Sequence, residues 1–269
     1  MHTSAVVFPF DQFGSAGTGA GAQLLGDALR EIVEDTDDET EPTRGACFAD
    51  RVTIDEFTFD RSADLQDWKK NAAAVIREAF ADGESLLWLA GNHLSVLPIY
   101  EALGKDALVI QFDAHLDAFN LSDCVTDLSH GNFLMHAEGP LPKVVNVGSR
   151  DLFLPPAHVK KYFDRVWPAE EFDEVLTGLA PLVKKAKKIW LDIDCDVFDP
   201  AYFPAVQHPL PFGLSPAQVL QVIRAVWSTK VAGVSISEFD PGRDREEKSL
   251  STLVWLMEWL LLKRYERVV

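Results

Sequence analysis

Short apolar runs alternate with helix-like stretches along most of the chain. The predicted strands are 5–10, 52–59, 86–90, 107–112, 143–148, 188–194 and 231–237. The predicted helices are 21–35, 67–82, one that follows the loop 91–93, 215–228 and the apolar stretch that closes the chain. Strands that alternate with helices imply right-handed crossovers and parallel pairing. The pattern therefore predicts an α/β fold of three layers, αβα, with a mostly parallel sheet covered on both faces.

Residues at the ends of the predicted helices suit their positions. Ser215 and Pro216 are typical of an N-cap and of the first helical position, and Gly83 is typical of a C-terminal cap. We expect the acidic run 34–41 to be a solvated loop or a helix end. No shift in composition and no long linker divides the chain, so we expect one domain over residues 1–269.

The balance of charge is strongly acidic, with a net charge of −17 over 269 residues. Such a surface repels phosphate backbones, which argues against a nucleic-acid partner, and it attracts cationic small molecules. Solubility, or a salt-rich source, is the simpler explanation of this charge. The cysteines at positions 47, 124 and 195 form no CxxC pair, which indicates reduced thiols in a cytoplasmic protein.

Neither end of the sequence predicts a membrane segment. The N-terminus lacks a basic region followed by an apolar run, so we expect no signal peptide. The apolar C-terminal stretch is interrupted by Glu258 and is too short to span a bilayer. We therefore expect a buried helix there and no membrane partner.

Residues suited to chemistry stand just after several predicted strands. They are His93, the segment 113–117, the pair Asp194 and Asp196, and Glu238. In parallel sheets, sites form beyond the carboxyl ends of the strands. We therefore expect these side chains to gather at one edge of the sheet.

Asp113, His115 and Asp117 occupy alternate positions. In an extended segment, alternate side chains share a face, so all three would point the same way. Two carboxylates and an imidazole suit Mn²⁺, Zn²⁺, Fe²⁺ or Co²⁺, and oxygen-rich sites favour Mn²⁺. A polar loop after a strand is the alternative interpretation.

A second acidic cluster follows the strand 188–194, and its members are Asp192, Asp194, Asp196 and Asp199. So much like charge at a buried strand end is costly unless cations neutralise it. A solvated acidic turn is the alternative, although the apolar neighbours favour burial. His93 alone would be a structural histidine. Beside two carboxylate clusters it becomes a candidate ligand of a two-metal site, which polarises a bound water.

These residues fall in motifs that resemble those of the ureohydrolase family, which includes arginase, agmatinase and formimidoylglutamase. The matching segments are AGNH at 90–93, DAHLD at 113–117, SHGNF at 129–133, VGSRD at 147–151, DCDVFDP at 194–200 and SEFDP at 237–241. Their order and spacing extend over most of the chain. The resemblance implies an arginase-like fold and a homo-oligomer.

The resemblance also implies roles for individual residues. Two Mn²⁺ ions, or other divalent ions, would be bound, one by His93, Asp113, Asp117 and Asp194 and the other by Asp113, His115, Asp194 and Asp196. Asp113 and Asp194 would bridge the ions, with a hydroxide between them. Glu238 would pair with the cationic head of the substrate, and His130 would pass a proton to the leaving amine. A surface acid and a loop histidine are the simpler alternatives for these two.

Three positions depart from the family pattern. Asn92 replaces an Asp that supports the ligand histidine, which implies altered metal affinity. Asp192 stands where the family often has Ser, as a supporting acid or a protonated buried carboxyl. Phe153 stands where arginases carry an acid that helps to hold the α-ammonium group, which argues against free arginine as substrate. A repacked loop with no effect on the substrate is the alternative.

The leading hypothesis is hydrolysis of a linear C–N bond in a small cationic guanidino or amidino compound, with release of urea. Agmatine-like and guanidino-acid substrates rank above arginine. Hydrolysis of a formimidoyl group and a deacetylase-like reaction with a single zinc are alternative activities. A catalytically silent relative that binds metal for a regulatory role is the alternative outside enzymes.

Overall fold

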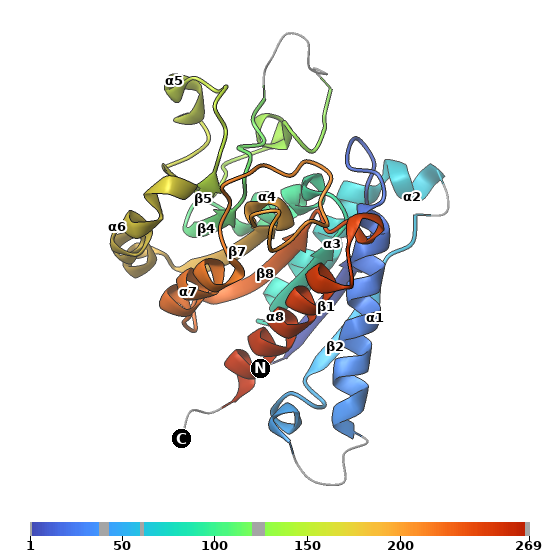
Figure 1. The fold of residues 1–269 in the computed structure, drawn as a ribbon. Helices are drawn as coiled ribbons and strands as arrows, with labels where there is room; N and C mark the ends of the chain where they lie inside the picture. The colour runs from blue at the N-terminus through green and yellow to red at the C-terminus, as the bar shows by residue number, and fades with distance from the viewer. Residues whose placement is uncertain (1, 38–42, 60–61, 120–126, 267–269) are drawn as a thin grey trace.

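The computed structural model describes residues 2–37, 43–59, 62–119 and 127–266, and Figure 1 shows their arrangement. All eight strands pair in parallel in one sheet, in the order β2-β1-β3-β8-β7-β4-β5-β6. The strands are β1 Thr3–Phe8, β2 Val52–Glu56, β3 Ser85–Ala90, β4 Ala107–Phe112, β5 Lys143–Ser149, β6 Arg165–Pro168, β7 Lys188–Asp194 and β8 Val231–Ser237. The predicted parallel sheet is thus confirmed.

Helices cover both faces of this sheet. They are α1 Thr18–Asp37, α2 Ser62–Gln66, α3 Trp68–Ala81, α4 Leu97–Leu103, α5 Pro156–Val159, α6 Phe172–Lys185, α7 Pro216–Val226 and α8 Lys248–Tyr265. One hydrophobic core joins the sheet to α1, α6, α7 and α8, and the other joins it to α3 and α4. Figure 1 shows α1 and α8 side by side on one face. The three predicted αβα layers are therefore present.

Several predicted boundaries agree with the structure, and others are shifted. The strands 107–112, 188–194 and 231–237 are found as predicted. Ser215 caps α7 in a capping box with Gln218, and Gly83 follows α3 with a φ of +71°. The first strand ends at Phe8 rather than at residue 10, because Pro9 has no amide hydrogen for the sheet.

The sequence pattern missed some elements. The edge strand β6 has only four residues, which is too short to show a period, and α6 was not predicted with it. Of the acidic run 34–41, residues 34–37 end α1 and the rest lies outside the described residues. Cys47 and Cys195 are free thiols, as expected, whereas Cys124 lies outside the described part.

The strand order determines where the candidate residues meet. Strands β3, β8, β7 and β4 are consecutive neighbours in the middle of the sheet. In this register Asp194 pairs with Ser237, and Phe112 pairs with Ile193. The segments that leave these four strands therefore start side by side at the carboxyl edge.

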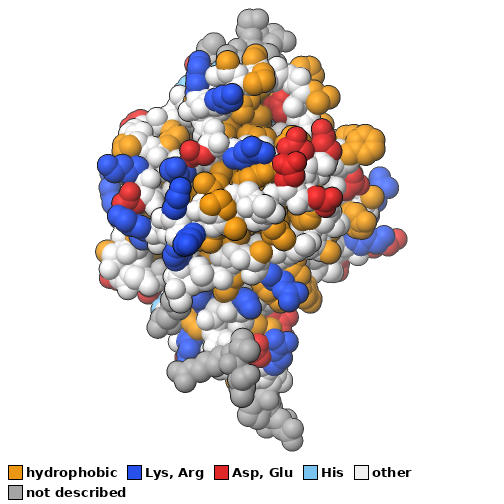
Figure 2. Space-filling model, turned by 90° about the vertical axis from the view of Figure 1, so that its left-hand side faces the viewer, with side chains coloured by type: hydrophobic (Ala, Val, Ile, Leu, Met, Phe, Trp, Pro, Cys, Tyr) orange, Lys and Arg blue, Asp and Glu red, His pale blue; other side chains and the backbone are white. Residues whose placement is uncertain are grey.

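The surface and the last helix complete the fold. Figure 2 shows the side of the molecule that lies at the left of Figure 1, where Lys and Arg side chains are scattered among hydrophobic ones. The predicted helix is present as α8, but only one side of it is buried: eight of its 18 residues are buried, and Trp255 is 53% exposed. Among the described helices, none has both the length and the apolar character to cross a membrane.

Candidate metal centre and active site

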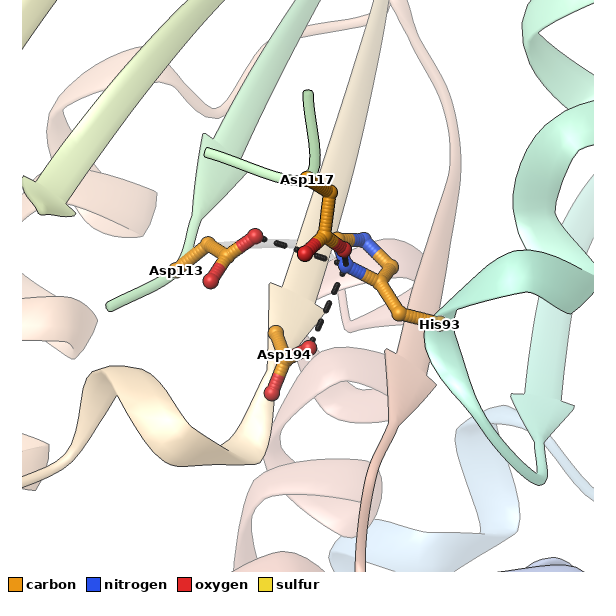
Figure 3. A group of neighbouring side chains, drawn as sticks. All are labelled: His93, Asp113, Asp117 and Asp194. Carbon is orange, nitrogen blue, oxygen red and sulfur yellow. Dashed lines mark hydrogen bonds and ion pairs between the residues drawn. The ribbon is translucent and has the colours of Figure 1, made fainter. Parts of the chain in front are cut away.

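His93 lies at the centre of the candidate site. It begins a short 3₁₀ helix after β3 and is completely buried. Its Nδ1 atom lies 2.7 Å from a carboxylate oxygen of Asp117, 3.2 Å from one of Asp194 and 3.3 Å from one of Asp113. Figure 3 shows these three carboxylates turned toward this one ring nitrogen. The predicted meeting of the segments after β3, β4 and β7 is therefore present.

The segment after β4 reaches the site through a turn. Asp113 accepts hydrogen bonds from the Gln111 side chain at 3.0 Å and from the His115 amide at 2.6 Å. Asp117 has a φ of +42°, in the left-handed region that bulky residues rarely adopt. The prediction that Asp113, His115 and Asp117 share one face of an extended segment is therefore wrong, because the backbone turns to bring them together.

The segment after β7 supplies the remaining carboxylates. Asp194 accepts the amide of Asp196 at 2.9 Å, and Asp196 lies 2.7 Å from Nδ1 of His115. Asp199 faces elsewhere, since its carboxylate accepts the amides of Ala201 and Gly213 in the following loop. Asp199 therefore shapes a turn and does not join the site.

Two groups of donor atoms are close enough to hold a metal ion each. In the first group, His93, Asp113, Asp117 and Asp194 present ligand atoms within 4.8 Å of one another. In the second group, Asp113, His115 and Asp196 do the same. Asp113 belongs to both groups, as expected of a bridging ligand, whereas Asp194 joins only the first. All six residues predicted as ligands are thus brought together.

Burial and neighbouring charges shift the pKa values of several side chains in this cluster. Burial, together with the charges of Asp117 and Asp196, raises the pKa of Asp113 to about 8. Burial and the charge of Asp196 also raise the pKa of Asp194 well above its usual value. Burial alone would lower the pKa of His115, but the charge and hydrogen bond of Asp196 raise it to about 10. Such a concentration of buried carboxylates is the environment that cations stabilise.

The donor set fits divalent metal ions. Four carboxylates and two imidazoles supply oxygen and nitrogen atoms, and five of these six side chains are buried. Mn²⁺, Fe²⁺, Co²⁺ and Zn²⁺ all bind such mixed sites, and the carboxylate-rich composition favours Mn²⁺. The site could therefore hold two ions that share Asp113.

Glu238 and His130 lie beside the donor groups. Glu238 follows β8 with a φ of +64°, and its carboxylate accepts the amide of His93 at 2.8 Å. The Nδ1 atom of His130 lies 3.4 Å from the same carboxylate and 3.3 Å from the hydroxyl of Ser15. Burial would lower the pKa of His130, but Glu238 raises it above its usual value. The positive φ of Glu238 is a strained backbone conformation, and such strain is common at functional sites.

A cavity of about 460 Å³ opens over these residues. Its acidic lining consists of Asp117, Asp151, Asp194, Asp196 and Glu238. Leu152 and Phe153 also line it and are 91% and 76% exposed, which places them at its mouth. The cavity thus combines an acidic interior with an apolar rim.

The roles of two further residues of the cavity, His208 and Arg150, were not predicted from the sequence. His208 stacks on His130 with ring centroids 5.6 Å apart. The terminal nitrogens of Arg150 donate to four backbone carbonyls, those of Gly148, Asp196, Val197 and Leu210. The VGSRD motif drew attention to Arg150, but no sequence signal connects it to these carbonyls.

Asn92 also has a defined role. Its amide nitrogen donates to the carbonyls of Gln12 and Gly14, both at 2.8 Å. An Asp at this position could donate neither bond, because an ionised carboxylate only accepts. Asn92 therefore ties the loop after β1 to the site.

The fold and the donor set together define a class, an α/β protein with two groups of residues that could each hold a metal ion at the carboxyl edge of a parallel sheet. Comparison with known families narrows this class. A family model described as Arginase family matches residues 3–262. The chain belongs to the Arginase family.

Individual relatives are more distant. The chain is 29% identical over 206 residues to a protein named putative agmatinase 3 of Schizosaccharomyces pombe, which covers 66% of this chain and 50% of that protein. It is also 29% identical over 196 residues to guanidinopropionase of Pseudomonas aeruginosa, and this match covers 67% of this chain and 61% of that protein. The match thus spans between half and three fifths of these relatives.

Solved structures show the same fold. A hypothetical agmatinase from Burkholderia thailandensis superposes with a TM-score of 0.78 and 23% identity, over 98% of this chain and 86% of that one. At this level of identity the likeness supports the arginase-like fold and leaves the substrate open.

Proposed function

We propose that this protein is a hydrolase that depends on two divalent ions, with Mn²⁺ the leading candidate, and cleaves a linear C–N bond of a guanidino or amidino compound. The observation that carries this proposal is the pair of donor groups that share Asp113 beneath one cavity. Membership of the Arginase family supports it.

The proposed metal ligands are His93, Asp113, Asp117 and Asp194 for one ion, and Asp113, His115 and Asp196 for the other, with Asp194 near both. When bound, such ions lower the pKa of a water molecule and so supply hydroxide at neutral pH. The Asp113 carboxylate would be a ligand of both ions. Because the ligands follow β3, β7 and β4, which with β8 are consecutive in the sheet, the rigid sheet would orient them.

Glu238 and His130 would act on the substrate. Glu238 lines the cavity and offers a negative charge to a guanidinium or amidinium group. His130 lies beside it, and the hydrogen bond and charge of Glu238 raise its pKa, which favours the protonated imidazole. Hydrolysis of a C–N bond needs protonation of the leaving amine, and His130 is placed to donate that proton.

The rim of the cavity favours a substrate without an amino-acid end. Phe153 occupies a mouth position where an acid would hold an α-ammonium group. The terminal nitrogens of Arg150 are occupied by backbone carbonyls, so they are not free to bind a carboxylate. We therefore rank agmatine-like compounds first, guanidino acids next, and arginine and formimidoyl dicarboxylates last.

A urea-release assay on the purified, Mn²⁺-loaded protein tests this proposal. Agmatine, 3-guanidinopropanoate, 4-guanidinobutanoate and arginine would be compared, with Asp194→Ala as the inactive control. We expect urea from agmatine and none from the control. Metal binding without urea from any compound would reject guanidine hydrolysis and favour a formimidoyl or amide substrate, or a silent metal-binding relative.

A further inference from the structure

Asp192 lies behind His93, on the side of the ring opposite the first donor group. It belongs to β7, two residues before Asp194, and is completely buried. It is a member of neither donor group and does not line the cavity. A buried carboxylate so close to a metal site, yet outside it, needs its own explanation.

Three donors surround the Asp192 carboxylate. One oxygen lies 2.9 Å from Nε2 of His93 and accepts the hydroxyl of Tyr100 at 2.6 Å. The other oxygen accepts the hydroxyl of Ser235 at 2.5 Å. Charge-assisted hydrogen bonds of this length are strong, and together they hold the carboxylate in one orientation.

The hydroxyl groups are themselves fixed. Tyr100 lies on helix α4 and Ser235 on strand β8, so two different elements hold the Asp192 carboxylate. The indole nitrogen of Trp190 donates to the Ser235 hydroxyl at 2.8 Å. Because the Ser235 oxygen accepts that bond, its own hydrogen is directed to Asp192.

The contact with His93 determines which ring nitrogen is free. When an ion binds Nδ1, the ring hydrogen would lie on Nε2 and be donated to Asp192, and the lone pair of Nδ1 would face the ion between Asp113, Asp117 and Asp194. A ligand histidine whose second nitrogen donates to a carboxylate has a fixed tautomer, a fixed orientation and greater basicity. Nδ1 is the nitrogen that lies within the first donor group.

We propose that Asp192 is a positioning residue for one of the two ions, and that Tyr100 and Ser235 hold it in place. This inference rests on the proposed two-metal site. It also predicts selectivity, because Asp192 contacts His93 and does not contact His115, whose Nδ1 lies against Asp196. Loss of Asp192 therefore lowers the affinity for the ion bound by His93 far more than the affinity for the ion bound by His115.

Calorimetric titration of the metal-free protein with Mn²⁺ tests this selectivity. The isosteric variant Asp192→Asn should lose about 10- to 100-fold in affinity for one ion. The affinity for the other ion should stay within about twofold, because its ligands keep their contacts. Tyr100→Phe and Ser235→Ala should lower the affinity for the same ion by smaller factors. These two variants replace Asp192→Asn in the test if that variant does not fold.

Ser237→Ala is the matched control. Ser237 lies on the same strand as Ser235, and its hydroxyl has no hydrogen-bond partner among the described residues. This variant should bind both ions as the parent protein does. Thermal unfolding of each metal-free variant separates a local effect on the metal from a general loss of stability.

The outcomes are distinguishable. Two ions bound by Asp192→Asn with unchanged affinities would reject the positioning role and leave the proposed function standing. An equal loss of both ions would show that Asp192 supports the fold rather than one ligand. If the parent protein binds no ion, the proposed function fails and this inference fails with it.

Discussion

A β-carbon on residue 14 would overlap the imidazole ring of His130, so the two residues pack as they do only because residue 14 is glycine. Gly14 has a φ of +138°, which other residues rarely adopt. The His130 amide donates to the carbonyl of Phe13 at 3.3 Å, and Ser15 contacts its ring. The loop after β1 therefore contacts the proposed proton donor, His130, and fixes its position.

Gly14→Ala should displace His130 without touching the metal ligands. We expect urea release to fall by at least about tenfold, because small displacements of a catalytic group are costly. Metal content, measured by atomic emission, should remain that of the parent. Full activity in this variant would show that His130 need not occupy its observed position.

His130→Asn should remove the proton donor itself. Loss of a general acid typically lowers the rate by about 10²- to 10⁴-fold. We expect kcat to fall in this range while the bound metal stays unchanged. Steady-state kinetics beside metal analysis would check this, and an unaltered kcat would leave His130 without a catalytic role.

Asn92→Asp should destabilise the protein although it restores the residue typical of the family. The change removes two hydrogen bonds to the carbonyls of Gln12 and Gly14 and places a negative charge beside them. We expect a loss of about 1–3 kcal/mol in the free energy of unfolding. Thermal unfolding of the metal-free protein measures it, with Asn92→Ala as a control that should lose less. Equal or greater stability of the Asp variant would contradict this role.

The stability of the metal-free protein should fall as the pH rises from about 6.5 to about 10. The pKa of Asp113 is raised from 3.8 to about 8, so the stability from its protonated form is complete below 3.8 and lost as the pH passes 8. The pKa of His115 is raised from 6.5 to about 10, so its contribution is complete below 6.5 and lost toward 10. The two contributions have the same sign.

Asp196 does not oppose this trend. Burial would raise its pKa, but the charge and hydrogen bond of His115 lower it below its usual value, so its contribution is lost only in acid. Bound ions should replace the protons and flatten the pH dependence. Melting temperatures from pH 6 to 10, with and without Mn²⁺, would check this. A metal-free protein whose melting temperature rises over this range would contradict the assignment.

Much of this architecture could be predicted from the sequence. The strands that end at Phe112, Asp194 and Ser237 are continuous apolar runs, and such runs are the strongest local signal of buried parallel strands. The rule that sites form at the carboxyl ends of parallel strands then brought the six candidate ligands together. The local sequence pattern and the order of parallel strands were sufficient to predict that these six residues lie together.

Other features depend on contacts between distant segments, which no local pattern records. The partners of Asp192 lie 92 and 43 residues away, at Tyr100 and Ser235. The occupation of Arg150 by backbone carbonyls depends on loops that meet only in the fold. The turn at Asp117 likewise follows from the position of the strands, so the alternation of residues suggested the wrong geometry.

The central claim is that two ions, bound by residues that share Asp113, enable hydrolysis of a guanidino compound. The most direct test is to measure Mn²⁺ content and urea release from agmatine on the same samples as the metal-free protein is titrated with Mn²⁺. We predict about two ions per chain at saturation and urea release that follows their binding. A chain that binds no Mn²⁺, or whose urea release is independent of it, would contradict this account.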